Sequence, residues 1–294
     1  MSTEDMNITD QKVGKDSVVV GNAEAPAIYA IAIGASPLIS KSISEGAIAI
    51  GQNQLAGREE KENKNDKVKW PIAIGADSVS SGTASIALGQ KVVASGVQAV
   101  AISQNSMSTG SSSVAVGSGS ISSGSSSIAL GQKVSASGSQ AIVIGQNSSV
   151  TGSRSIVLGS DSKSSSSSSI IVGQKVNISA SQGIAIGQNA SVTASGGIAL
   201  GANSVASKSN VVSVGRPGNQ RKIVNVAAGN ISKNSTEAVN GQQLYAELAR
   251  MNALDIKNKQ LEMDIKKLES TIDNLTHSIT HLTLGTSKNS QYKK

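Results

Sequence analysis

The chain has 294 residues with one Trp, three Tyr and no Phe, and 38% of its residues are hydrophobic. This aromatic content is too low for an ordinary globular core, whereas the aliphatic content is too high for a disordered chain. The net charge of +7 is spread along the chain, which argues against nucleic-acid binding, and the absence of Cys excludes disulfides and thiolate metal sites.

The N-terminal part is irregular. Residues 1–20 form a polar segment, and imperfect turns then close at Gly21, Gly34 and Gly51 before a regular pattern begins. We expect a repetitive head over residues 21–215, interrupted by an inserted loop at 52–70. The insertion contains the mixed-charge sequence "REEKENKNDKVKW", which predicts a solvated loop, with a ligand site as the alternative.

Glycines recur through the head on a regular 14-residue lattice, and only the slot at position 103 deviates by holding Ser. A fixed period of this size indicates a solenoid, in which each repeat forms one coil. The glycines on this lattice are Gly75, Gly89, Gly117, Gly131, Gly145, Gly159, Gly173, Gly187, Gly201 and Gly215.

Each repeat contains a short alternating stretch such as Ile86-Ala87-Leu88, which has the two-residue period of a strand. A second small residue, such as Gly96, follows seven positions after the lattice glycine. The sequence therefore predicts an all-β parallel β-roll in which every coil has two short strands and two tight turns.

We expect the interior of this narrow roll to hold a single layer of Ile, Val and Leu, which is too thin for a stable isolated chain. The opposite face carries small residues, and we expect it to pack against identical chains. Its members are Ala73, Ala87, Ala101, Ala115, Ala129, Ala185 and Ala199.

A longer repeat, made of three successive units of the lattice, places "GQKV" at 89, 131 and 173. It aligns Lys91, Lys133 and Lys175 in one row along the roll, about 14 Å apart. This row is a candidate site for polyanionic or triple-helical ligands. The alternative is a solvated surface that internal duplication has left behind.

Beyond the head we expect a connecting segment at 216–243, a helical coiled coil at 244–284 and a polar tail at 285–294. The helix carries a heptad pattern with Leu at d, Ile at a and Asn258 at an a position. This combination by itself favours two strands, so the heptads alone do not define the number of chains. The predicted coiled-coil core consists of Leu254, Asn258, Leu261, Ile265, Leu268, Ile272, Leu275, Ile279 and Leu282.

The sequence predicts a protein that is not an enzyme and has no catalytic, cofactor or metal site. Its only histidines, His277 and His281, occupy the solvent-facing f and c positions of the coil, and a single pair lacks the further ligands that zinc needs. The many serines have no neighbouring His to activate them. No apolar run is long enough for a membrane span.

The phrase "SIALGQ" and the segments "VGRPGNQRKIVNVAAG" and "TEAVNGQQL" resemble the YadA-like head and neck of trimeric autotransporter adhesins, over roughly residues 17–250. The resemblance implies a homotrimer of three left-handed β-rolls, which a neck narrows into a coiled-coil stalk. It also implies that Arg216, Arg221 and Asn225 make contacts between chains in the neck.

By the same resemblance, the head is expected to bind host extracellular matrix, host cells or other bacteria from the bacterial cell surface, at the outer membrane. Members of the family begin with a signal peptide and end in a membrane barrel, neither of which is recognisable here. We therefore expect either a passenger fragment of an adhesin or a related fibre, such as a phage tail fibre. The identity of the ligand is not readable from the sequence.

Overall fold

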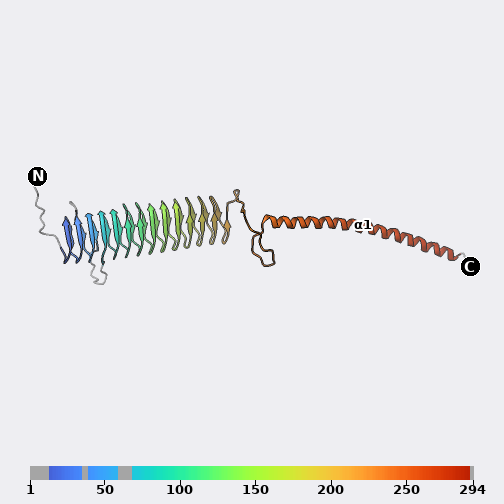
Figure 1. Cartoon of the computed structure of the whole chain (residues 1–294), viewed down its shortest axis with the longest axis horizontal. Coiled ribbons are helices and arrows are strands. Elements are labelled where there is room, and N and C mark those ends of the chain that lie inside the picture. The colour runs from blue at the N-terminus through green and yellow to red at the C-terminus, as the bar shows by residue number, and fades with distance from the viewer. Residues whose placement is uncertain (1–12, 35–38, 59–67, 292–294) are drawn as a thin grey trace. The chain divides into compact units, whose positions relative to one another are not determined.

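The computed structural model describes residues 13–34, 39–58 and 68–291. The chain divides into two compact units, Met1–Arg221 and Lys222–Lys294. The first is a β-solenoid, and the second consists of an irregular segment followed by one long helix. Figure 1 shows the solenoid strands as a stack of arrows that runs from blue to yellow.

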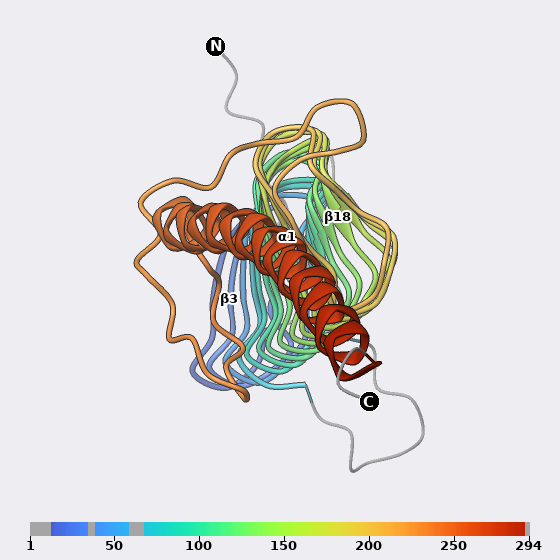
Figure 2. The same cartoon turned by 90° about the vertical axis from the view of Figure 1, so that its right-hand side faces the viewer.

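The solenoid has two parallel sheets, and each coil contributes one strand to each, except that β27 is followed by no strand of the second sheet. Figure 2, which looks along the stack, shows β3 and β18 on different sides of the coil. The 14-stranded sheet contains β1 (Val18–Gly21), β3 (Ile31–Gly34), β5 (Ile48–Gln52), β7 (Ile72–Ala76), β9 (Ile86–Gln90), β11 (Val100–Ile102), β13 (Val114–Val116), β15 (Ile128–Gln132), β17 (Ile142–Gln146), β19 (Ile156–Ser160), β21 (Ile170–Val172), β23 (Ile184–Ile186), β25 (Ile198–Leu200) and β27 (Val212–Ser213).

The strands of the 13-stranded sheet are shorter, and most have only two residues. They are β2 (Ala23–Glu24), β4 (Ser40–Ser42), β6 (Leu55–Ala56), β8 (Val79–Ser80), β10 (Val93–Ala94), β12 (Met107–Ser108), β14 (Ile121–Ser122), β16 (Ser135–Ala136), β18 (Ser149–Val150), β20 (Lys163–Ser164), β22 (Asn177–Ile178), β24 (Ser191–Val192) and β26 (Val205–Ala206).

The strands pair in the register of the sequence repeat. Ile128 lies beside Ile142, and Ile142 lies beside Ile156, so that residues one repeat apart occupy the same place in successive coils. The predicted parallel β-solenoid with a 14-residue coil is therefore confirmed. Residues that share a place in successive coils are called a column below.

The predicted direction of the side chains is wrong. Ala87, Ala101 and Ala129 point into the coil and have no exposed surface, whereas Leu88 is 40% exposed and Leu200 is 45% exposed. In most coils the strand-centre residue that faces the interior is alanine, and Val143, Val157 and Ile171 occupy the same column and are also fully buried. Because side chains alternate along a strand, the Ile, Val and Leu residues on either side of this position point outward.

Pairs of facing residues fill the coil interior, and their sizes compensate each other. Ile178 stands five positions before Gly183, at which a Cβ atom would lie 2.9 Å from the Ile178 Cγ2 atom. In another coil the corresponding pair is Ala94 and Ala99, both fully buried. The large Ile178 thus faces a glycine, because a second side chain there would not fit in a close-packed interior.

In other coils the facing pair consists of two serines that hydrogen-bond across the interior. The Oγ atoms of Ser122 and Ser127 lie 2.6 Å apart, and both residues are fully buried. The Ser127 hydroxyl also contacts the carbonyl oxygen of Gly124 at 2.6 Å. Because their hydroxyls have partners, these serines can stand in the core without an unsatisfied polar group.

The lattice glycines are required by the backbone and by the close stacking of coils. Gly131 has a φ of +132°, and a Cβ atom there would collide with the carbonyl oxygen of Gly145 in the next coil. Ser103, which occupies the one deviating slot, has a φ of +95°. A serine in this region of φ is strained.

The predicted boundaries of the head need two corrections. Strand β1 begins at Val18, inside the segment predicted as 1–20, and the predicted loop at 52–70 contains β6. Strand β6 pairs with both β4 and β8 and thus belongs to the solenoid. Most of the mixed-charge sequence at 58–70 lies outside the described residues.

In the second unit, α1 (Gly241–Gln291) begins before the predicted coil and extends past its predicted end at 284. Asn240 caps this helix, because its Oδ1 atom accepts a hydrogen bond from the Gln243 amide at 3.1 Å. The Asn240 amide in turn donates a hydrogen bond to the Gln243 Oε1 atom at 3.3 Å, which completes a capping box.

Candidate functional site

The most extensive candidate surface is the outer face of the 14-stranded sheet. Each strand there presents two aliphatic residues, one on either side of the inward-facing residue at the strand centre. We call these two rows the outer apolar columns. They comprise Ile72, Ile86, Val100, Val114, Ile128, Ile142, Ile156, Ile170, Ile184 and Ile198, together with Ile74, Leu88, Ile102, Val116, Leu130, Ile144, Leu158, Val172, Ile186 and Leu200.

The outer apolar columns remain partly exposed in the single chain, where Ile144 is 41% and Leu158 is 38% exposed. A continuous apolar face over ten coils is larger than a monomeric protein ordinarily leaves in water. It therefore marks an interaction surface. The sequence pattern alone predicts these residues inside the roll, whereas the structure turns them outward.

The apolar residues of α1 form a second uncovered surface. The predicted core residues Leu261, Ile265 and Leu268 are 49%, 53% and 62% exposed in the single chain. Most of the stability of a helix in water comes from packing its apolar face. A 51-residue helix with this pattern therefore needs a partner helix.

The structure places Lys91, Lys133 and Lys175 in one column at a tight turn. Each has a positive φ of 53–56° and is exposed. The same column contains Asp77 one coil before Lys91 and Asp161 one coil before Lys175. The row is therefore not purely cationic, because acidic residues interrupt it at spacings of about 4.8 Å.

The three neck residues have different surroundings. Arg221 binds its own chain, where its guanidinium donates to the Ser204 Oγ atom at 3.0 Å and to the carbonyl oxygens of Val214 and Ala202 at 2.6 Å each. Arg221 thereby closes the last coil of the solenoid. In the part of the chain that the structure describes, the side chains of Arg216 and Asn225 make no hydrogen bond.

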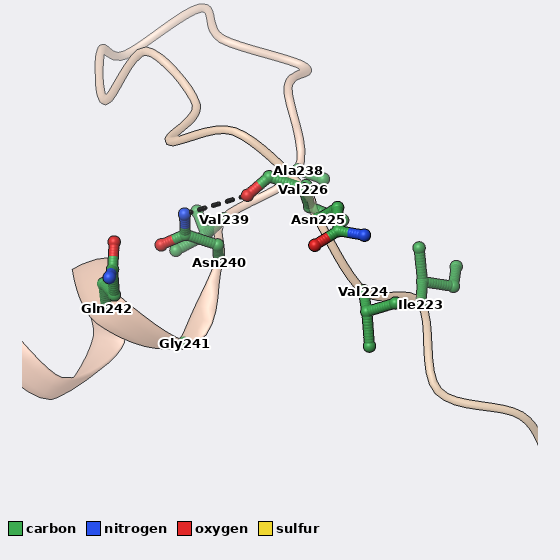
Figure 3. A pocket seen from close by; sticks show the side chains of 9 residues that line it. All are labelled: Ile223, Val224, Asn225, Val226, Ala238, Val239, Asn240, Gly241 and Gln242. Atoms are coloured by element: carbon green, nitrogen blue, oxygen red, sulfur yellow. Dashed lines mark hydrogen bonds between the residues drawn. The ribbon is translucent and has the colours of Figure 1, made fainter.

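A shallow apolar hollow lies in the second unit, between the segments at 223–226 and 238–242. Figure 3 shows Ile223, Val224 and Asn225 on one side of it, and the hydrogen bond from Asn240 Nδ2 to the Val226 carbonyl on the other. Ile223 and Val224 are each 70% exposed. The hollow is thus a further apolar surface without a cover in the single chain.

His277 and His281 stack edge to face on α1, with ring centroids 5.0 Å apart. Among the described residues, no group of three or more His, Cys, Asp or Glu side chains could hold a metal ion. Within the same residues, no helix is both long enough and apolar enough to cross a membrane.

The coils match a known family. The family model described as YadA head domain repeat (2 copies) matches residues 72–91, 108–133, 136–162 and 179–204, all of which lie in the solenoid. The matched coils are YadA head repeats, and we call the solenoid the YadA-like head below. The match confirms the expected resemblance to the head of trimeric autotransporter adhesins.

Two solved structures are similar to the YadA-like head. The C-terminal YadA-like domain of a Burkholderia pseudomallei protein is 33% identical over 32% of this chain, with a TM-score of 0.29. This chain spans 55% of the length of that domain. The collagen-binding domain of the Yersinia adhesin YadA is 24% identical over 69% of this chain and 83% of its own length, with a TM-score of 0.33. Comparison with curated proteins finds no match.

Proposed function

We propose that the chain is the exposed part of a homotrimeric bacterial surface adhesin that attaches cells to host extracellular matrix or host cells and promotes autoaggregation. The observation that carries the proposal is the continuous outer apolar face of the YadA-like head. A second copy of the same chain covers this face with its own outer apolar columns.

The outer apolar columns, and not the alanine face, are the proposed contact between copies. The alanines are fully buried inside each coil and cannot reach a neighbour. Aliphatic residues at two positions in every strand provide a contact that repeats along the whole head. Burial of such residues contributes about 25 cal/mol per Å², so many coils together give a large stabilisation.

The exposed core of α1 supports the same arrangement. Ile at a and Leu at d favour two strands in an isolated coil. Three copies are proposed because the head repeats are those of a trimeric family. Arg216 and Asn225 are the proposed contacts between copies in the neck, and Ile223 and Val224 offer an apolar surface beside Asn225.

Attachment by such a molecule depends on repetition. Three copies of each surface site stand around a rigid head, so that weak individual contacts combine into high avidity. The proposed location is the bacterial cell surface, with the outer membrane as the site of attachment. The alternative of a phage tail fibre shares the architecture, but no feature of the described residues favours it.

The test uses the full chain, purified and coupled to beads of bacterial size. We expect these beads to bind immobilised collagen, fibronectin or laminin, or cultured host cells, more strongly than albumin-coated beads do. The matched control carries Ile142→Lys and Ile156→Lys in the outer apolar columns, which separates the copies and removes avidity. The proposed attachment would be contradicted if beads that carry the native chain bind every matrix protein and cell type no more strongly than albumin-coated beads do.

A further inference from the structure

One corner of the solenoid, near its N-terminal end, carries an aromatic residue in two of three successive coils. Tyr29, Gly46 and Trp70 occupy the same column, because each stands two positions before the paired Ile31, Ile48 and Ile72. Backbone bonds from the Gly46 amide to the Ile28 carbonyl and from the Trp70 amide to the Glu45 carbonyl hold these coils in register. Tyr29 and Trp70 are thus two coils apart, about 10 Å.

These aromatic residues depart from what the rest of the column contains. Further along the head the same position holds small residues or flexible polar ones, namely Ala84, Gln98, Ser112, Ser126, Gln140, Arg154, Ser168, Gln182, Gly196 and Asn210. The φ angles of Tyr29 and Trp70 are +58° and +52°, a region in which bulky residues are rare. A bulky side chain retained at a position that disfavours it indicates a functional demand.

The two rings face water. Tyr29 is 59% and Trp70 is 58% exposed, although large aromatic side chains are among the residues that gain most from burial. They contribute no packing to the coil interior, which their column does not reach. Their exposure therefore has no structural explanation in the fold.

Gly46 and Lys69 orient the indole ring. A Cβ atom at Gly46 would collide with the Trp70 ring, so only glycine lets the ring lie against this coil. The Lys69 Nζ atom lies 6.0 Å from the ring centroid and 2.8 Å from a carboxylate oxygen of Glu45. The ring therefore lies between the backbone of Gly46, which has no side chain, and the ion pair of Lys69 and Glu45.

Charged groups alternate with the rings along this corner. Asp16 precedes Tyr29 by one coil, since Val18 pairs with Ile31, and Glu45 and Lys69 stand next to Gly46 and Trp70. The Glu45 and Lys69 side chains are 33% and 40% exposed, so their free hydrogen-bonding capacity faces the solvent. We call the set Asp16, Tyr29, Glu45, Gly46, Lys69 and Trp70 the aromatic corner.

From this arrangement we propose that the aromatic corner binds an extended, β-linked oligosaccharide that lies along the solenoid axis. A sugar ring has an apolar face of C–H groups, which stacks on an aromatic ring, and a rim of hydroxyl groups, which bonds to carboxylates and ammonium groups. A protein partner of comparable size needs a desolvated apolar core, from which charged side chains are depleted. The corner instead alternates rings with charges.

The direction of the ligand follows from the column. Because Tyr29 and Trp70 lie on one straight line about 10 Å apart, they suit a chain that stays extended over two or more sugar units. A β-1,4-linked chain is extended in this way, whereas an α-1,4-linked glucan chain curls away from the line. This inference names a ligand class for the proposed adhesin and rests on that function for the source of the glycan.

Trp70 is the only Trp in the chain, so its intrinsic fluorescence reports on this corner alone. We expect chitohexaose or cellohexaose, added to the intact full chain, to shift and enhance Trp emission in a saturable way, whereas maltohexaose gives no saturable change. The absence of a saturable change with both β-linked hexasaccharides, or an equal response to maltohexaose, would overturn the proposal.

Variants separate recognition from folding. Tyr29→Ala retains the fluorescent ring and is expected to weaken hexasaccharide binding about threefold, and Trp70→Ala about tenfold by calorimetry. Trp70→Phe retains a stacking face and much of the affinity. The matched control, Gln98→Ala in the same column two coils away, leaves affinity unchanged. Equal affinity of native chain and Tyr29→Ala would overturn the site even if Trp70→Ala does not fold.

The same variants distinguish this inference from the adhesin proposal. Attachment of coated beads to matrix proteins or cells is measured in parallel for the native chain and Tyr29→Ala. If hexasaccharides do not bind while the beads still attach, the glycan site is wrong and the adhesin proposal stands. If hexasaccharides bind with the expected loss in Tyr29→Ala while no bead attaches, the glycan site stands and the adhesin proposal fails.

Discussion

Ser103 is the one residue of the repeat lattice that occupies a glycine's conformation. Its φ of +95° is strained for a residue that has a side chain, and the other coils of the lattice have glycine at this position. We predict that Ser103→Gly stabilises the head by about 1 kcal/mol per chain, after the entropy cost of glycine is taken into account. Thermal unfolding should show a higher midpoint for this variant, and a lower one for the control Ser95→Gly, in which no such strain is relieved.

The buried serine pairs lead to a prediction about coupling. Ser122→Ala or Ser127→Ala alone leaves a buried hydroxyl or carbonyl without its partner, at a cost of about 1–3 kcal/mol. The double variant recreates the natural Ala94 and Ala99 coil, so its cost should be well below the sum of the single costs. Strictly additive losses in denaturant unfolding would show that the pair does not act as a unit.

At the scale of single elements, the start of α1 depends on its cap. Asn240→Ala removes the acceptor for the Gln243 amide and the donor to the Val226 carbonyl. We predict a loss of about 1 kcal/mol, seen as faster hydrogen exchange in the first helical turn. Asn252→Ala in the middle of the helix is the control and should not accelerate exchange there. Unchanged hydrogen exchange in Asn240→Ala would mean that the Asn240 cap does not stabilise the first turn of α1.

The lysine row belongs to the same scale, because it runs along one turn of successive coils. Conversion of Lys91, Lys133 and Lys175 to Gln is predicted to weaken binding of the full chain to heparin by only about two- to threefold, since surface charges contribute little and Asp77 and Asp161 interrupt the row. The control converts Lys163, Lys208 and Lys222. An equal loss in both variants would assign the row to ordinary solvated surface.

Much of the element structure could be predicted from the sequence. The glycine lattice predicts the strand pairs, the coil length and the turn positions, and the heptad pattern indicates the helix core. The inward face could not be read from alternation alone, because a two-residue period defines two faces without saying which is inside. Only the structure decides this, because it buries Ala87 fully and leaves Leu88 40% exposed.

The irregular coils before Gly75 are harder to predict from the sequence, because it does not show which of their strands pair. Strand β6 follows Gly51, which lies outside the regular lattice, and precedes an insertion that the regular coils lack, so its membership of the solenoid shows only in its pairing with β4 and β8. Tyr29 and Trp70 stand far apart in the sequence, on either side of that insertion. Only the three-dimensional register brings them into one column.

At the scale of the whole molecule, both units leave apolar surface that one chain does not cover. In the head it is the outer apolar columns, and in α1 it is the heptad core. Head and helix are therefore expected to assemble from identical copies. Substitution of outward Ile142 and Ile156 by Lys should separate these copies, whereas the same change at exposed Ser95 and Ser137 should not.

Sedimentation equilibrium of the purified full chain tests the central claim most directly. The account predicts a single species with three times the chain mass of 29.6 kDa, which persists on dilution to low micromolar concentration. A compact, folded species of 29.6 kDa with a cooperative unfolding transition would contradict it. Such a species would show that the outer apolar columns can remain in water.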